Sequence, residues 1–264
     1  MNNNKITYTI ALIFIAIAFT SSCKKPDPKP SPSNKGKLNL SMNIYWDNAP
    51  LQYDTLMYIN AAGNHYLVNE VQFFISEVTI YKAGKAKVLN GWQKEHYFDS
   101  NISTTMQWPF ADDIEVGTYD SLSFTFGFSN ADNVSFMFVN PPESQMFWPE
   151  YLGGGYHYMK LNGKWRLPSG DLAGSDFHLG RGQIRDAVGN ITGFVDNSFR
   201  VSLSNSAFTI SSDATTNVPL IMDVKEWFEN PNIIDLNVIG GAIMEVQSTQ
   251  ILAKENGWNV FRVK

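Results

Sequence analysis

"LNLSMNIYW", from Leu38 to Trp46, places an apolar side chain at every second position. Five apolar residues therefore share one face of an extended chain: Leu38, Leu40, Met42, Ile44 and Trp46. Successive side chains of a β-strand point to opposite faces of its sheet, so this period of two indicates a strand with one buried face. The stretch predicts stacked β-sheets that enclose an apolar interior.

Similar runs follow along the chain. "VNEVQFFISEVTIY" (Val68–Tyr81) is a longer predicted strand whose alternation slips near Glu77, which indicates a β-bulge. The other predicted strands are Thr118–Phe128, Tyr156–Leu161, Phe199–Ser204 and Trp258–Val263. Turn sequences such as "AAGN", "EVGTY" and "LPSGD" separate the runs. The predicted fold class is all-β: one antiparallel β-sandwich over residues 38–264.

Two short helices are predicted near the C-terminus. In Asp223–Phe228, Asp223 is followed three residues later by Glu226, which is typical of a helix start. The segment Met244–Asn256 contains good helix formers, and Gly257 after it is expected to end that helix. The region Ser129–Gly155 has weak periodicity with many prolines and glycines, so we expect a long ordered loop there.

The N-terminus has the pattern of an export signal. Lys5 precedes an apolar run that ends in small residues directly before Cys23, the single cysteine of the chain. We interpret residues 1–22 as a lipoprotein signal peptide and Cys23 as the lipid attachment residue. Residues 23–37 alternate proline with polar residues and are expected to form a semi-extended linker. No acidic run follows the cysteine, so we expect a lipoprotein of the outer membrane that faces the periplasm.

Composition narrows the choice of partners and chemistry. The formal net charge of the 264-residue chain is −5, which argues against binding to nucleic acid. With Cys23 lipidated, the exported chain has no disulfide, so its stability must come from core burial or a metal. The sequence contains no GxSxG, P-loop, HExxH or CxxC motif, and no nucleophile and base can be assigned. We therefore predict that the protein is not an enzyme.

The four histidines are the candidate metal ligands. His65 follows a turn and is expected to be a polar edge residue, and His96 lies among charges and is expected at the surface. His157 shares a predicted strand face with Met159, so it is either a hydrogen-bonded core histidine or a ligand. His178 in "FHLG" alternates with two apolar neighbours and is expected to point outward. Since the two predicted strands lie about a hairpin apart, His157 and His178 can face each other across them.

Three stretches of the sequence carry a family resemblance: "YLVNEVQFFISEVTIYKAG" (66–84), "MFWPEYLGGGYHYMKLNG" (146–163) with "FHLG" (177–180) shortly after it, and "IMEVQSTQILAKENGWNVFRV" (243–263). Through these stretches, which occur in the family's order, the chain resembles the MbnP family of periplasmic copper-binding proteins. The resemblance implies a β-sandwich that binds copper through histidine. His178 matches the histidine of the "FHLG" motif, and Trp148 matches the tryptophan ahead of the glycine–tyrosine strand.

Further expectations follow from that resemblance. In relatives a tryptophan oxidised to kynurenine assists the copper site, and its oxidation is linked to a partner di-haem enzyme of the cytochrome c peroxidase type. The predicted site is therefore His178 and His157 around Cu(I), with Trp148 beside the ion. Methionines could add soft thioether ligands, although adaptable core packing is their usual role; those near the site or further along the chain are Met137, Met146, Met159, Met222 and Met244.

A second function class stays open from the sequence. Tryptophans in an exposed row can stack on sugar rings, so a lipoprotein that binds a glycan or another protein is the alternative to a copper protein. The candidate residues for such a platform are Trp92, Trp108 and Trp148. Exposure of these side chains distinguishes the two functions, since a platform must be accessible whereas a copper site needs its histidines close together.

Overall fold

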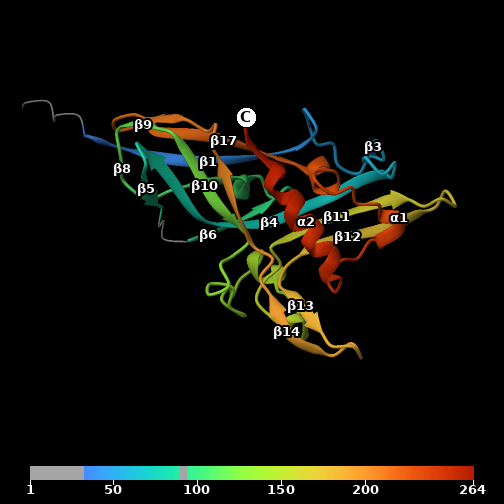
Figure 1. Cartoon of the computed structure of the whole chain (residues 1–264). Coiled ribbons are helices and arrows are strands. Elements are labelled where there is room, and N and C mark those ends of the chain that lie inside the picture. The colour runs from blue at the N-terminus through green and yellow to red at the C-terminus, as the bar shows by residue number, and fades with distance from the viewer. Residues whose placement is uncertain (1–32, 90–93) are drawn as a thin grey trace, which may run out of the picture. The chain divides into compact units, whose positions relative to one another are not determined.

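The structure is a computed structural model that describes residues 33–89 and 94–264 (Figure 1). The predicted signal peptide, Cys23, most of the linker and Trp92 lie outside the described residues. Two large β-sheets enclose one continuous apolar core to which both sheets contribute. The prediction of an all-β sandwich is confirmed. No helix in the described ranges is both long enough and apolar enough to cross a membrane.

The first sheet is built around β1 (Lys35–Trp46), which starts three residues before the predicted strand. Its neighbours are β2 (Ala49–Pro50), β7 (Gln107–Pro109), β8 (Ile114–Glu115), β17 (Thr215–Asp223) and, on the far side of β17, β18 (Phe261–Val263). The five apolar residues of the alternating face are all buried. Among the strand pairs of the described residues, only β1 with β17 is parallel.

The second sheet carries the candidate site and has the order β12–β11–β4–β10–β15. Its long central strand β4 (His65–Lys82) also pairs with three short strands. The other members are β3 (Tyr58–Ile59), β5 (Lys85–Val88), β6 (Glu95–Asp99), β10 (Ser121–Phe126), β11 (Met159–Arg166), β12 (Leu172–Leu179) and β15 (Phe199–Leu203). The predicted bulge is confirmed, because the register with β10 shifts beside Glu77, whose φ is +52°.

Smaller elements complete the domain. Two separate ribbons pair β13 (Gly182–Arg185) with β14 (Ile191–Val195) and β9 (Gly117–Tyr119) with β16 (Phe208–Ile210). Figure 1 shows that β13 and β14 project beyond the large sheets. The remaining helices are η1 (Ser103–Met106), η2 (Glu143–Met146), η3 (Glu150–Leu152) and α1 (Leu236–Ile239).

Both predicted C-terminal helices are present, but the first is a 3-10 helix and the second has different bounds. The first is η4 (Val224–Phe228), a 3-10 helix whose N-cap Asp223 accepts a hydrogen bond from the Lys225 amide. The second is α2 (Gln247–Val260), so the prediction that Gly257 ends it was wrong. A Cβ at Gly257 would lie 2.1 Å from Cζ of Phe199. The glycine therefore permits close packing of the helix on β15.

The segment between β10 and β11 is the predicted long loop. Over residues 127–158, all of which the structure describes, the chain has only η2 and η3 and no strand. Side chains within the loop hold it in shape, because Asn133 Oδ1 accepts from the Tyr156 amide at 2.8 Å and the Tyr156 hydroxyl accepts from the Phe138 amide at 2.8 Å. The loop is thus an ordered part of the domain beside β11 and β12, which carry the candidate ligands.

Candidate metal centre

His178 lies on β12 and points away from the sandwich core, as predicted. Its neighbours Phe177 and Leu179 are 0% and 2% exposed, so they form the inward face of the strand. His178 is half-buried under the long loop. Its partner across β11 is Lys160 rather than His157. The prediction that the two histidines face each other on paired strands was therefore wrong in register.

His157 precedes β11 and belongs to the long loop. Its backbone amide donates to the Met146 carbonyl at 2.7 Å, and its ring Nδ1 lies 2.9 Å from the same oxygen. Only 5% of the residue is exposed. Because the strand alternation does not extend to His157, its side chain is free to turn toward the outer face of the sheet. There it meets His178.

The two imidazole rings lie side by side despite their different origins. Their centroids are 5.2 Å apart with an angle of 83° between the ring planes. With metal–nitrogen bonds of about 2 Å, two imidazoles that share one ion have centroids no more than about 6 Å apart. The structure thus brings His157 and His178 together at a separation compatible with one shared ion.

Hydrogen bonds indicate which nitrogen of each ring carries the proton. A carbonyl oxygen only accepts, so the Met146 carbonyl requires the proton of His157 on Nδ1 and leaves a lone pair on Nε2. On His178, Nε2 lies 2.7 Å from Oδ1 of Asn162. The other nitrogen of His178, Nδ1, is buried and has no hydrogen-bond partner. A buried polar atom without a partner is unusual and fits a site for a ligand.

Both imidazoles are held neutral. Burial, with a smaller contribution from the positive charge of Lys160, lowers the pKa of His157 to about 3. Burial likewise lowers the pKa of His178 to about 4, although the carboxylate of Asp176 opposes the shift. Metal ions bind the unprotonated nitrogen of imidazole, so both rings are in the state that a metal requires at neutral pH.

Trp148 packs against His157. Its ring meets that of His157 edge to face, with centroids 4.7 Å apart, and the residue is fully buried. Positive φ angles at Gly153, Gly154 and Gly155 reverse the backbone, so that the Trp148 amide donates to the Gly155 carbonyl at 2.8 Å. The indole Nε1 donates to the Leu152 carbonyl at 3.2 Å. An indole N–H is only a donor, so Trp148 shapes the site and does not ligate through nitrogen.

Gly180, directly after β12, supports Trp148 from the other side. A Cβ at this glycine would lie 2.5 Å from Cε3 of the indole. We expect Gly180→Ala to displace the indole and lower the free energy of unfolding by about 1–3 kcal/mol, as overpacking does. Gly174→Ala on β12 is the matched control, because a Cβ there meets nothing within 4 Å. Urea unfolding monitored by tryptophan fluorescence measures both, and equal stabilities would contradict this packing role.

Lys160 and Asn162 are site residues that the sequence reasoning missed. Lys160 donates to the Gln145 carbonyl at 2.7 Å and so ties β11 to the long loop. Both residues could have been predicted from the position of the turn "LPSGD". Because Arg166 pairs with Leu172 across this turn, counting back along the two strands places Lys160 opposite His178. Asn162, two residues along β11, then falls on the same outer face.

The methionines contribute little to the site. Met146, Met159 and Met222 belong to the buried apolar core, and Met137 packs against it. Core packing therefore accounts for these four residues. Within residues 33–89 and 94–264, no group of three or more His, Cys, Asp or Glu side chains is placed to hold a metal ion. The candidate centre consists of two imidazoles.

The tryptophan platform is not supported by the described part of the chain. Trp108 is 5% exposed and Trp148 is fully buried, so neither indole can stack on a sugar at the surface. His96, expected at the surface, instead stacks on Trp108 with centroids 5.1 Å apart, and burial lowers its pKa to about 4. His65 is exposed, as expected.

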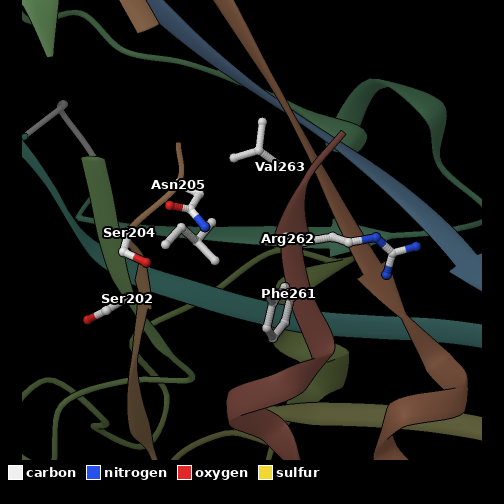
Figure 2. Close-up of a pocket in the computed structure, with 7 residues that line it drawn as sticks. Ser202, Ser204, Asn205, Phe261, Arg262 and Val263 are labelled. Carbon is white, nitrogen blue, oxygen red and sulfur yellow. The ribbon is translucent and has the colours of Figure 1, made fainter. Parts of the chain in front are cut away.

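A separate hollow of about 270 Å³ lies where β15 ends beside β18 (Figure 2). It shares no residue with the histidine pair; its lining is Ser202, Leu203, Ser204, Asn205, Phe261, Arg262 and Val263. Arg262 is the one charged residue of that lining, and its guanidinium extends away from the serines toward an ion pair with Asp223 at 2.8 Å. The hollow therefore offers no imidazole, thioether or carboxylate ligand for a metal.

Comparison with known proteins places the chain in a family. Residues 35–245, well over half of the chain, match the family model described as MbnP. The structure is also similar to that of MbnP from Methylosinus trichosporium, with a TM-score of 0.52 and 14% sequence identity over 76% of this chain and 80% of that chain. At that identity the likeness shows a shared fold alone. No curated protein matches the chain. On the extent of the family match, this chain belongs to the MbnP family.

Proposed function

We propose that the protein is a periplasmic lipoprotein that binds copper, as Cu(I), for acquisition, storage or delivery and without catalytic turnover. One observation carries the proposal: the ring centroids of His157 and His178 lie 5.2 Å apart, and Nδ1 of His178 is buried there without a hydrogen-bond partner. His157 would hold copper through Nε2 and His178 through Nδ1. Trp148 would pack beside the ion.

The chemistry of the ligands favours Cu(I) over other biological metals. Calcium and magnesium need several oxygen ligands, and zinc usually takes three or four protein ligands. Two neutral imidazoles suit a soft ion that tolerates low coordination, which is Cu(I). The ammonium group of Lys160 adds positive charge next to both rings. That charge penalises a divalent ion more than a monovalent one.

Titration of the metal-free mature chain with Cu(I) under anaerobic conditions tests the proposal. We expect one equivalent to bind tightly in competition with a chromophoric Cu(I) chelator. Zn(II) is expected to bind far more weakly, since the pair supplies only two ligands. Absence of any Cu(I) binding, or tighter binding of Zn(II), would contradict the proposal.

Membrane attachment through Cys23 is the second part of the proposal. It rests on the signal-like residues 1–22 and the placement of the cysteine directly after them. We expect Cys23→Ala to release the protein into the soluble periplasmic fraction, because no lipid can then be attached. Fractionation and mass spectrometry of the N-terminal peptide measure this. A variant that stays with the membrane as the parent does would refute lipid anchoring.

The family suggests a di-haem enzyme of the cytochrome c peroxidase type as a partner, with oxidation of Trp148 to kynurenine. The position of Trp148 against His157 is compatible with such a modification affecting the copper site. Because the indole is fully buried, oxidation by a partner would require electron transfer through the protein. Mass spectrometry of the Trp148 peptide from native cells tests this, and an unmodified tryptophan there would count against the partner.

A further inference from the structure

A series of hydrogen-bonded polar side chains extends from His178 across three strands of the second sheet. Asn162 on β11 presents Oδ1 to Nε2 of His178 at 2.7 Å and donates from Nδ2 to Oε2 of Glu70 at 3.0 Å. Glu70 lies on β4, where it is the register partner of Asn162. Its other oxygen, Oε1, accepts from Nδ2 of Asn101 at 2.8 Å. Each side chain of this series therefore has a defined hydrogen-bond partner.

The carboxylate of Glu70 determines which way the Asn162 amide points. A carboxylate only accepts hydrogen bonds, so the group that Asn162 turns toward Glu70 must be its NH₂. The amide oxygen must then face His178, and it too only accepts. For this reason Nε2 of His178 carries the ring proton, and Nδ1 keeps its lone pair. The direction of each hydrogen bond therefore follows from the negative charge of Glu70.

We propose that Asn162, oriented by Glu70, is a positioning residue that fixes the tautomer and ring orientation of His178 so that Nδ1 is its metal-binding atom. This inference rests on the proposed copper function. Hydrogen bonds from outside the ligand set commonly hold metal-binding histidines in this way. The backbone fixes Asn162 and Glu70 in register, and the long loop independently fixes His157 through the Met146 carbonyl.

The arrangement gives the two ligands opposite tautomers. His157 is protonated on Nδ1 and His178 on Nε2. Without Asn162, neither nitrogen of His178 would have a partner, since Nδ1 already lacks one. The ring would then populate both tautomers and rotate about its bond to Cβ. A metal would have to select one of these states, which lowers its apparent affinity.

The experiment uses the complete mature chain with ¹⁵N-labelled histidine. The chain has only four histidines, so ring nitrogen signals in long-range ¹H–¹⁵N spectra can be assigned by single substitutions. In the metal-free parent we expect His178 to be protonated on Nε2 alone, with His157 protonated on Nδ1 as an internal reference. In Asn162→Leu and in Glu70→Gln, His178 is expected to show both tautomers, because the oriented acceptor is lost or can turn round.

Affinity for Cu(I) is the second readout. Asn162→Leu is expected to weaken binding about 10–100-fold, the usual effect of removing such a partner. Lys164→Leu is the matched control, since Lys164 lies on the same face of β11 but pairs with Gly174. It should bind copper as the parent does. Thermal unfolding shows that each variant is folded.

The outcomes separate this inference from the proposed function. A metal-free parent with His178 protonated on Nδ1 overturns the inference, as does Asn162→Leu with a single tautomer and parental affinity. Failure of the parent to bind Cu(I) overturns the proposed function and the metal-positioning role together. In that case the tautomer spectra alone still decide whether Asn162 and Glu70 orient the ring.

Discussion

His178→Ala is expected to weaken Cu(I) binding by more than about 100-fold, since loss of a partner outside the ligand set alone costs 10–100-fold. With one of two imidazoles removed, the ion keeps a single protein nitrogen. The fold should survive, because His178 is half-buried outside the apolar core and the variant loses one side-chain hydrogen bond, that of Nε2 with Oδ1 of Asn162. Competition with a Cu(I) chelator measures affinity, and circular dichroism measures the fold.

His157→Ala should abolish tight binding to a similar extent. It also removes the ring hydrogen bond to the Met146 carbonyl, so a small loss of stability is expected as well. Trp148→Phe should weaken binding less than either, because the indole packs beside the pair without ligating. His65→Ala is the control, since His65 is exposed at the start of β4. A His178→Ala protein that binds Cu(I) as tightly as the His65→Ala protein would remove the basis of the copper site.

The free energy of unfolding of the metal-free protein is expected to fall steeply as the pH drops from about 6.5 to about 4. Burial lowers the pKa of His96 and His178 to about 4 and that of His157 to about 3. In this window the unfolded chain binds more protons than the folded chain, so stability rises with pH. Each pKa unit corresponds to about 1.4 kcal/mol, so each histidine contributes at most about 3–5 kcal/mol.

Two carboxyl groups oppose this trend. Burial raises the pKa of Glu95 and of Glu226, so their protonation favours the folded state as the pH falls. Two carboxyl groups act against three imidazoles, so their effect should be smaller. Urea unfolding at pH 7, 6, 5 and 4 measures the net effect of the histidines and the carboxyl groups on the free energy of unfolding. His96→Leu should lower the number of protons taken up on unfolding by about one, because one of the three buried imidazoles is gone. The free energy of unfolding should then depend less steeply on pH. Stability that does not change between pH 7 and pH 4 would contradict the burial of these rings.

Local sequence determined much of the fold. Strict alternation from Leu38 to Trp46 was sufficient to predict a strand with one buried face, because a β-strand has a period of two whatever its partners are. The slip near Glu77 correctly located the bulge in β4. The outward direction of His178 followed in the same way from its two apolar neighbours, both of which are buried. Each of these properties depends on residues adjacent in the chain.

Tertiary structure decided which side chains are in contact. Gly257 has the sequence features of a helix end, yet α2 continues through it because the glycine lets the helix approach Phe199. His157 alternates with Met159 in the sequence, but the Met146 carbonyl holds it outside the strand and turns its ring toward His178. These contacts join segments separated in the chain by a loop or by several strands. Alternation specifies the face on which a side chain lies, whereas only the folded loop and the register of the strands bring the two imidazole rings together.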